Sequence, residues 1–361
     1  PLRRQRQMCI RDRDFILWAL QIPNEIQAMM RDYLEIIFLG ITATFLYNYF
    51  ANLLRAIGNS VLPLVFLAVS AVLNVVLDLV CVLLFNWGVK GAAIATVFSE
   101  FISAIGIAIY TFKRFKQLIP EKEDMKWNRN NLSAILNLSV MTSLQQSIMN
   151  FGILMVQGLV NSFGTVIMAA FAAAVKIDSF AYMPVQDFGN AFSTYVAQNY
   201  GAGKQERIRK GIKSAFVTSV IFCAIISLLV IVFAKPLMCI FINPDETEII
   251  SAGVIYLCIE GSCYIGIGIL FLLYGYYRAV NKPFMSVVLT VISLGTRVLL
   301  AYILSAIPAI GVIGIWVSVP IGWALADITG VVYYFVKSKK QLEMIAVSYT
   351  HLRAHETGRN L

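Results

Sequence analysis

Long hydrophobic segments dominate the chain, and short polar stretches separate them. Nine complete segments, each 22–35 residues long, can be delimited at 33–57, 61–85, 91–112, 132–161, 165–199, 211–234, 249–277, 284–306 and 311–336. About 20 apolar residues let a helix cross a bilayer, whereas a membrane β-strand needs about 10 of alternating polarity. The pattern therefore predicts an all-α polytopic membrane protein and excludes a membrane β-barrel. Residues 15–20 resemble the end of a further helix, and Pro184 with Gly189 predicts a kink in the longest segment.

The composition excludes most classes of soluble protein. Of the 361 residues, 59% are hydrophobic and 14% are charged, whereas soluble domains average about 25% charged residues. The formal net charge of +9 would suit a nucleic-acid partner, but so apolar a chain has no surface on which to follow a phosphate backbone. We therefore expect membrane lipid around the protein and no nucleic acid.

The basic residues predict the orientation of the spans, because cytosolic loops of membrane proteins collect Lys and Arg. The connections between successive spans lie alternately on the two sides of the membrane. One set of connections carries 17 basic residues and the other carries three. The larger set lies at 55, 113–131, 204–213, 278–282 and 337–340, and the smaller one consists of Arg31, Lys90 and Lys235. This asymmetry places the loop 113–131 and the C-terminus in the cytosol.

The chain also contains an internal repeat with an offset of 223 residues. The matching positions are Arg55 and Arg278, Gly88 and Gly311, and Gly91 and Gly314. Repeated helix bundles with a binding site between them are typical of secondary transporters. The part of the second copy at 132–240 has no counterpart unless roughly ninety residues precede the chain. We therefore expect an N-terminally truncated sequence, whose intact form has two six-helix halves.

This repeat predicts how the chain is divided. The predicted parts are a partial N-terminal lobe at 15–112, a cytosolic inter-lobe loop at 113–131 and a C-terminal lobe at 132–340. The polar ends, 1–14 and 347–361, follow no helix or strand period. They are either cytosolic arms or non-native tails that resemble sequencing-adapter read-through, and we interpret them as non-native.

Three stretches resemble one family of transporters. They are LYNYFANLLRAIGNSVLPLVFLAVSAVLNVVLDL (46–79), KIDSFAYMPVQDFGNAFSTYVAQNYGAGKQERIRKG (176–211) and LYGYYRAVNKP (273–283). In these runs the chain resembles the multidrug and toxic compound extrusion (MATE) family, and the similarity covers 15–340. The resemblance implies a V-shaped pair of six-helix bundles in a bacterial plasma membrane. It also implies a monomer that exports small organic cations in exchange for Na⁺ or H⁺, with no other cofactor.

The same resemblance implies a cation-coupling site in the first lobe. Three of its positions match Asn74, Asp78 and Thr96, and the fourth, an Asp on helix one, lies outside this chain. Asn74 and Asp78 share one helix face, and their oxygens with that of Thr96 suit Na⁺, or a proton at the Asp. A charge inside the membrane costs about 2.5–3.5 kcal/mol or more and marks function by default. The alternative is that Asp78 and Thr96 merely join helices by hydrogen bonds.

Other ionisable residues inside the predicted spans give further candidates. With Asp78 they make six acids and two bases, and they are Glu100, Lys176, Asp178, Asp187, Glu260, Arg297 and Asp327. The net charge of −4 that results favours cationic substrates. Asp178 and Glu260 are candidates for coupling or substrate binding, as is Glu100, whose alternative is to face water. Candidates for lining a drug cavity, with packing as the alternative, are Met141, Gln145, Met149, Tyr182 and Met183.

No motif in the sequence indicates an enzyme. The run 201–204 resembles part of a phosphate loop, but Gln198 and Gln205 stand where the motif needs Gly and Ser or Thr. We interpret it as a tight basic turn. We therefore expect a cation-coupled exporter of organic cations. The alternatives are a flippase for lipid-linked oligosaccharide or peptidoglycan precursors, which would need a basic cavity, and a membrane scaffold that transports nothing.

Overall fold

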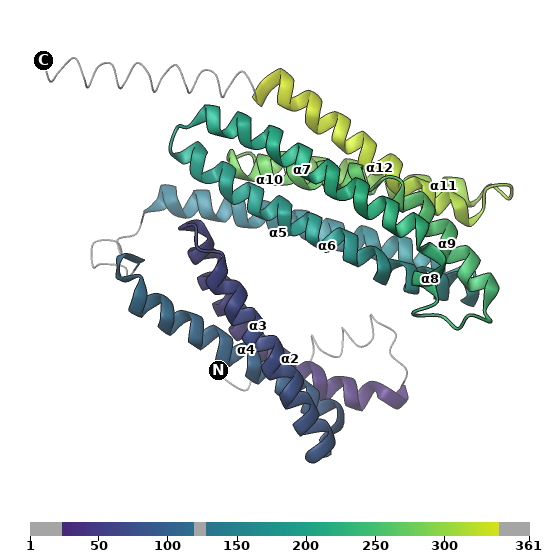
Figure 1. Cartoon of the computed structure of the whole chain (residues 1–361), viewed down its shortest axis with the longest axis horizontal. Coiled ribbons are helices and arrows are strands. Elements are labelled where there is room, and N and C mark those ends of the chain that lie inside the picture. The colour runs from purple at the N-terminus through teal and green to yellow at the C-terminus, as the bar shows by residue number, and fades with distance from the viewer. Residues whose placement is uncertain (1–23, 119–127, 339–361) are drawn as a thin grey trace, which may run out of the picture. The chain divides into compact units, whose positions relative to one another are not determined.

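The computed structural model describes residues 24–118 and 128–338, and these residues form helices joined by short turns, without a strand (Figure 1). The helices are α2 (Asn24–Ala56), α3 (Val61–Leu79), α4 (Gly88–Arg114), α5 (Arg129–Asn161), α6 (Thr165–Gly201), α7 (Gln205–Val232), α8 (Ala234–Met238), α9 (Thr247–Gly261), α10 (Tyr264–Ala279), α11 (Pro283–Ser305) and α12 (Val312–Tyr333). Outside the described residues lie both tails interpreted as non-native, the stub at 15–20 and residues 119–127 of the predicted inter-lobe loop.

Within the described part of the chain, seven helices are long and apolar enough to cross a membrane, or eight if α9 and α10 form one span. This result confirms the prediction of an all-α polytopic membrane protein. The estimate of nine complete spans also counted 132–161, which the structure places in α5. That helix has 33 residues but is too polar to meet the same criterion, because amides such as Asn137, Gln145 and Asn150 interrupt its apolar residues.

The predicted span 249–277 is not one straight helix. It is divided between α9 and α10, which are bent by 51° at Ser262 and Cys263, a point that we call the α9–α10 break. The Ser262 hydroxyl donates to the carbonyl of Ile259 at 2.8 Å, and the Cys263 amide donates to the carbonyl of Glu260 at 2.9 Å. The broken turn thus satisfies part of its own backbone, as a membrane interior requires.

By contrast, α6 continues as a single helix of 37 residues through Pro184, where the sequence predicts a kink. Gly189 in this helix permits close packing on α10. A Cβ atom at Gly189 would lie 2.9 Å from the carbonyl oxygen of Phe271, and one at Gly275 would lie 2.5 Å from that of Gly189. The two glycines therefore bring α6 and α10 into backbone contact, which sets the spacing of the helices around the site described below.

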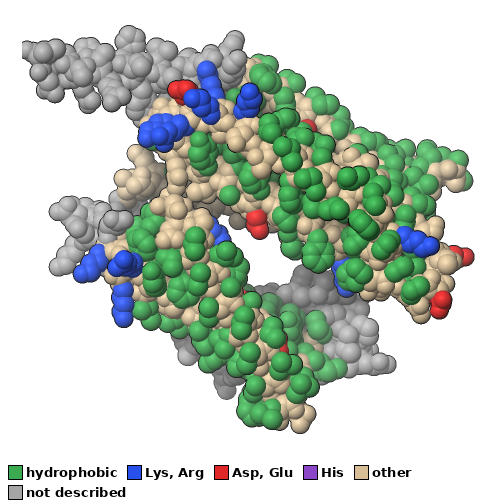
Figure 2. Space-filling view, viewed as in Figure 1, with side chains coloured by type: hydrophobic (Ala, Val, Ile, Leu, Met, Phe, Trp, Pro, Cys, Tyr) green, Lys and Arg blue, Asp and Glu red, His purple; other side chains and the backbone are tan. Residues whose placement is uncertain are grey.

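The chain divides into two compact units, residues 1–127 and 128–361. The first contains α2–α4, whose small core includes Phe50, Leu54 and Ile107. The second contains α5–α12 around a larger core with buried aromatic residues such as Trp316 and Tyr277. Hydrophobic side chains cover most of the surface visible in Figure 2, as expected for helices that face lipid tails.

The internal repeat is present in the backbone geometry. When 223 is added to their residue numbers, the bounds of α2 coincide with the start of α9 and the end of α10. In the same way, α3 corresponds to most of α11, and α4 corresponds to α12. Residues with positive φ recur at matched positions, namely Gly88 (+53°) with Gly311 (+53°) and Gly58 (+87°) with Asn281 (+59°). L-residues rarely adopt this conformation, so its recurrence indicates that both copies turn the chain in the same way.

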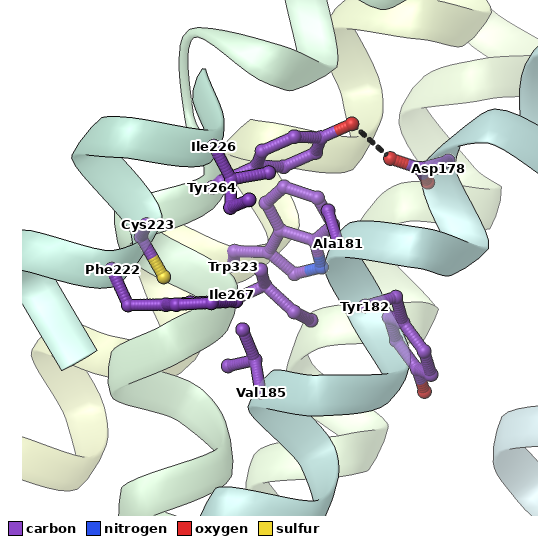
Figure 3. A pocket seen from close by; sticks show the side chains of 10 residues that line it. All are labelled: Asp178, Ala181, Tyr182, Val185, Phe222, Cys223, Ile226, Tyr264, Ile267 and Trp323. Carbon is purple, nitrogen blue, oxygen red and sulfur yellow. Dashed lines mark hydrogen bonds between the residues drawn. The ribbon is translucent and has the colours of Figure 1, made fainter. Parts of the chain in front are cut away.

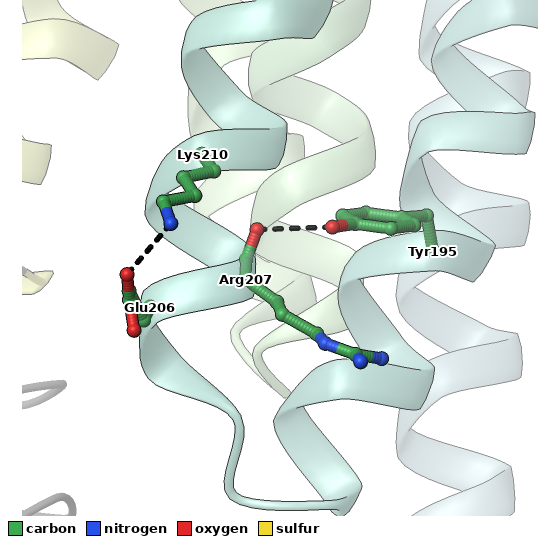
Figure 4. Close-up of polar contacts among 4 residues, drawn as sticks. All are labelled: Tyr195, Glu206, Arg207 and Lys210. Carbon is green, nitrogen blue, oxygen red and sulfur yellow. Dashed lines mark hydrogen bonds and ion pairs between the residues drawn. The ribbon is translucent and has the colours of Figure 1, made fainter.

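The turn between α6 and α7 is the tight, basic connection expected from the sequence (Figure 4). Tyr195 of α6 donates a hydrogen bond to the carbonyl of Arg207 at 3.0 Å. Lys210 and Glu206 form an exposed ion pair at 2.7 Å. Such exposed pairs contribute little to stability. The contacts of this turn are thus structural, in agreement with the rejection of a phosphate loop.

Candidate cation and substrate sites

A cavity of ≈ 320 Å³ lies inside the second unit, among α5, α6 and α9–α12. Side chains that line it include Met149, Asn150, Tyr182, Phe271 and Trp323. Three charged residues, Asp178, Glu260 and Arg297, also face it. A cavity with aromatic walls and a few convergent polar groups is typical of a small-molecule site.

Asp178 is held by hydroxyl groups from both sides of the α9–α10 break. Tyr264, the first residue of α10, donates a short hydrogen bond to Asp178 Oδ1 (Figure 3). Tyr256 of α9 donates to Asp178 Oδ2 at 3.5 Å. The carboxyl group on α6 therefore connects the two halves of the broken helix.

Rings packed around Tyr256 position its hydroxyl group. Phe171 and Trp316 are stacked with centroids 5.4 Å apart and planes 7° apart. The ring of Tyr256 meets both edge-on, at 5.5 Å from Phe171 and 5.0 Å from Trp316. Such ring pairs contribute about 0.5–1.5 kcal/mol each beyond area burial, so this cluster orients Tyr256 toward Asp178.

Glu260 is the most deeply buried acid at the cavity, with 2% of its side chain exposed. Its Oε1 has no hydrogen-bond partner among the described residues. Glu260 and Asp178 lie within hydrogen-bonding reach of each other, and the charge of Arg297 acts on both. Two carboxyl groups this close do not both stay charged without a compensating cation. The pair with Arg297 is therefore suited to bind a proton or a small cation.

Asp178 also borders a second, small pocket on its α7 side, shown in Figure 3. This pocket measures ≈ 10 Å³, and Phe222, Cys223 and Ile226 of α7 supply its apolar wall. A space of that size holds about one water molecule at most. The carboxyl group is thus shielded toward α7, and its accessible side faces the larger cavity.

In the first unit, the structure brings two of the three predicted coupling residues into contact. Asn74 Nδ2 of α3 donates to Thr96 Oγ1 of α4 at 3.2 Å. Asp78 follows one turn after Asn74 and is half-buried, and its Oδ1 has no hydrogen-bond partner in the described part of the chain. Directly after it, the helix widens into a π-helical turn at Val80–Leu84. Such turns are rare and frequently occur at functional sites.

Glu100 contacts α2 rather than the Asn74–Thr96 pair. Thr44 of α2 donates a hydrogen bond of 2.7 Å to Glu100 Oε2. Gly40 lets α2 and α4 approach closely, because a Cβ atom there would lie 2.8 Å from Val97 Cγ2. Glu100 therefore has a hydroxyl donor from the neighbouring helix.

The residues predicted to line a drug cavity occupy different environments. Met149 and Tyr182 line the cavity of the second unit and contact each other, with 3.5 Å between the hydroxyl oxygen and the sulfur. Gln145 is buried within α5, and Met141 lines a separate surface hollow near the start of α5. Met183 is 61% exposed and is not among the cavity residues. The sequence did not single out Tyr256 and Tyr264, because tyrosines in apolar helices carry no distinctive spacing.

Comparison with known proteins identifies the family. The family model described as MatE matches residues 10–80 and 139–303. The chain belongs to the MatE family. The match begins at residue 10, so it includes residues 10–14 of the tail that we interpreted as non-native.

The MatE relatives include two proteins of Bacillus subtilis (strain 168). Probable multidrug resistance protein YpnP is 30% identical over 282 residues, which are 78% of this chain and 62% of the relative. Probable multidrug resistance protein YoeA is 26% identical over 336 residues, or 91% and 72% of the two chains. This chain thus spans less than two thirds of the length of YpnP.

A solved MatE structure, that of the Vibrio cholerae MATE transporter VcmN in the bent form, has the same fold. The two structures match with a TM-score of 0.81 and a sequence identity of 22%. The match covers 93% of this chain and 74% of the VcmN chain. MatE proteins are transporters rather than enzymes, so the family membership confirms both the resemblance and the prediction that the chain is not an enzyme.

Proposed function

We propose that this protein is a secondary active antiporter that exports small organic cations in exchange for Na⁺ or H⁺. The observation that carries the proposal is the Asp178–Glu260 pair, of which Glu260 is buried and Asp178 half-buried, beside Arg297 in a cavity with aromatic walls. Two carboxylates and one guanidinium sum to a net charge of −1. One monovalent cation neutralises this charge, and flat rings and a thioether accommodate organic cations of varied shape.

Competition for this single charge provides the coupling. When a proton or Na⁺ occupies the pair, the cavity is neutral and holds an organic cation weakly. When neither ion is bound, the negative charge of the pair attracts the organic cation. Because two ligands that exclude each other are linked thermodynamically, binding of the coupling ion on one side of the membrane favours release of the substrate there.

Asp78 with Asn74 and Thr96 is the second candidate coupling site, and it lies in the first unit. Its unpartnered, buried carboxyl oxygen and the adjoining π-helical turn support a role in cation binding. The distribution of basic residues further supports a cytosolic C-terminus in a bacterial plasma membrane, and nothing in the proposed cycle requires more than one copy.

The flippase alternative is less well supported. Acidic residues outnumber basic ones at the cavity, and a lipid pyrophosphate would be repelled by such a site. The Bacillus relatives are also named as multidrug resistance proteins.

Ethidium efflux from cells that express the protein tests the proposal. We expect Glu260→Gln and Asp178→Asn, which keep the side-chain shape but remove a charge, to reduce efflux by about tenfold or more. Asp187→Asn is the matched control, because Asp187 lies on α6 with Asp178 but is exposed. Wild-type efflux in both cavity variants would refute the site assignment.

Two further measurements separate the alternatives. Stimulation of efflux by Na⁺ at fixed pH would identify Na⁺ as the coupling ion, and stimulation by a pH gradient without Na⁺ would identify H⁺. If the protein rescued a flippase-deficient strain but exported no dye, its substrate would be a lipid-linked precursor rather than an organic cation.

A further inference from the structure

Asp327 on α12 is a buried acid that neither proposed coupling site uses. Its side chain is 8% exposed, and its Oδ1 has no hydrogen-bond partner among the residues that the structure describes. Gly266 of α10 faces it, since a Cβ atom on this glycine would lie 3.6 Å from Asp327 Oδ2. An uncompensated charge in such a place costs several kcal/mol, so the group needs a ligand to neutralise it.

The helices packed against α12 supply no such compensation. α5 carries no charged residue after Arg129 at its start. On the neighbouring helices α9, α10 and α11 the titratable groups are Glu248, Tyr256, Cys258, Glu260, Tyr264, Tyr274, Tyr276, Tyr277, Arg278, Arg297 and Tyr302. Tyr277 reaches α12, but its hydroxyl donates to the carbonyl of Gly330 at 2.6 Å. Arg297 packs against α12 at Gly322, more than one turn before Asp327. None of these groups forms an ion pair with Asp327 within the described residues.

A metal ion does not fit this environment. Hard cations such as Mg²⁺ and Ca²⁺ require about six or more oxygen ligands. The described part of the chain contains no cluster of three or more His, Cys, Asp or Glu side chains that could hold a metal ion. Gly266, which faces Asp327, also lies against Trp323, and neither residue offers a side-chain oxygen. A proton fits this environment, because it needs no further oxygen atoms.

The first turn of α10 connects Asp327 to the cavity. Tyr264 in this turn donates to Asp178 on one side, and Gly266 packs against Asp327 on the other. The turn begins directly after the α9–α10 break, so any change in the bend of 51° moves both contacts together. Packed elements of this kind have discrete arrangements and can link two sites.

We propose that Asp327 is a second proton-binding site, which is protonated in this structure and is linked to the Asp178–Glu260 pair through the first turn of α10. The inference goes beyond the proposed function, because it concerns a group outside the cavity and does not depend on which substrate the protein carries.

Carbodiimide labelling of the wild-type protein tests whether the carboxyl group of Asp327 is protonated. Dicyclohexylcarbodiimide reacts with protonated carboxyl groups in apolar surroundings, and mass spectrometry locates the adduct. We expect adducts at Asp327 at neutral pH and none at Glu206, an exposed acid paired with Lys210. Labelling elsewhere in the membrane part without labelling at Asp327 would overturn the proposal. The experiment requires no transport, so it remains informative if the proposed function fails.

Infrared spectroscopy gives an independent readout of the same proton. The carbonyl band of a protonated carboxylic acid should lose intensity in Asp327→Asn relative to wild type at neutral pH. An unchanged band in a folded variant would show that Asp327 is ionised and would refute the site.

The link to the cavity has its own test. Tyr264→Phe removes the hydrogen bond to Asp178 but no charge, and we expect it to change the labelling rate at Asp327 by about fivefold or more. Tyr195→Phe is the control, because it removes a tyrosine hydrogen bond at the α6–α7 turn. Equal rates in wild type and Tyr264→Phe would refute the linkage while leaving the proton site in place.

Discussion

The two copies of the repeat share a backbone plan but differ in one pair of matched segments, α2 in the first copy and α9–α10 in the second. In the first copy, α2 is one unbroken helix of 33 residues. In the second, the matching residues form α9 and α10, which are bent by 51°. A break exposes backbone groups, and a membrane protein tolerates them only where protein or a cavity surrounds them. Here the break adjoins the Asp178–Glu260 cavity, so the copy that departs from regular geometry is the one with the enclosed polar site.

The acidic side chains of the two copies, Glu100 and Asp327, also differ in position and in hydrogen bonding. Glu100 of the first copy matches Trp323 of the second, and the carboxyl group of the second copy lies one turn later, at Asp327. Glu100 receives a hydrogen bond from Thr44, whereas Asp327 Oδ1 has no partner within the described residues. A shared scaffold therefore carries an acid stabilised by a hydroxyl in one copy and an acid that requires a proton in the other.

The largest expected effect tests whether the first copy also takes part in coupling. We expect Asp78→Asn to lower ethidium efflux by about tenfold or more, because it removes a membrane-embedded charge from the proposed site. Asp32→Asn is the control, since Asp32 forms a more exposed ion pair with Lys90 at 2.9 Å. Unchanged efflux in Asp78→Asn would leave the second copy as the sole coupling site.

A smaller effect tests whether the scaffolds are equivalent. Gly88→Ala and Gly311→Ala place a side chain at φ +53°, a strained conformation that costs about 1–3 kcal/mol at each position. Thermal unfolding in detergent should show similar losses for the two variants. Gly295→Ala, in the interior of α11 with nothing within 4 Å of a Cβ atom added there, should stabilise by up to about 1 kcal/mol. A loss in only one of the matched variants would contradict the shared backbone plan.

The smallest effect concerns the hydroxyl donor that distinguishes the two acids. Thr44→Val keeps the side-chain shape but removes the hydrogen bond to Glu100, and we expect a loss of about 1 kcal/mol in unfolding free energy. Thr329→Val removes a hydroxyl that bonds only within its own helix, to the carbonyl of Leu325, and should be nearly neutral. Equal stabilities of the two variants would indicate that Thr44 does not stabilise Glu100.

Much of the fold was accessible from the hydrophobic pattern alone, because lipid requires long apolar segments in which every backbone group is paired. The α9–α10 break was not, since the segment remains apolar enough on average to pass as one span in spite of Glu260, Gly261 and Ser262. Likewise, Gln146, Asn150 and Gln157 recur on one face of α5, but only the tertiary structure shows that this face lines the cavity.

By itself, the sequence determined that the protein is a helical membrane protein of the MatE family, that part of it repeats, and that a few acids lie among apolar spans. Tertiary structure decided which of those acids meet. Asp178 and Glu260 are 82 residues apart in the chain, and their approach depends on the break and on the close packing of Gly189 and Gly275. Spacing along a chain fixes neighbours on one helix, whereas contacts between helices arise from packing that no local pattern encodes.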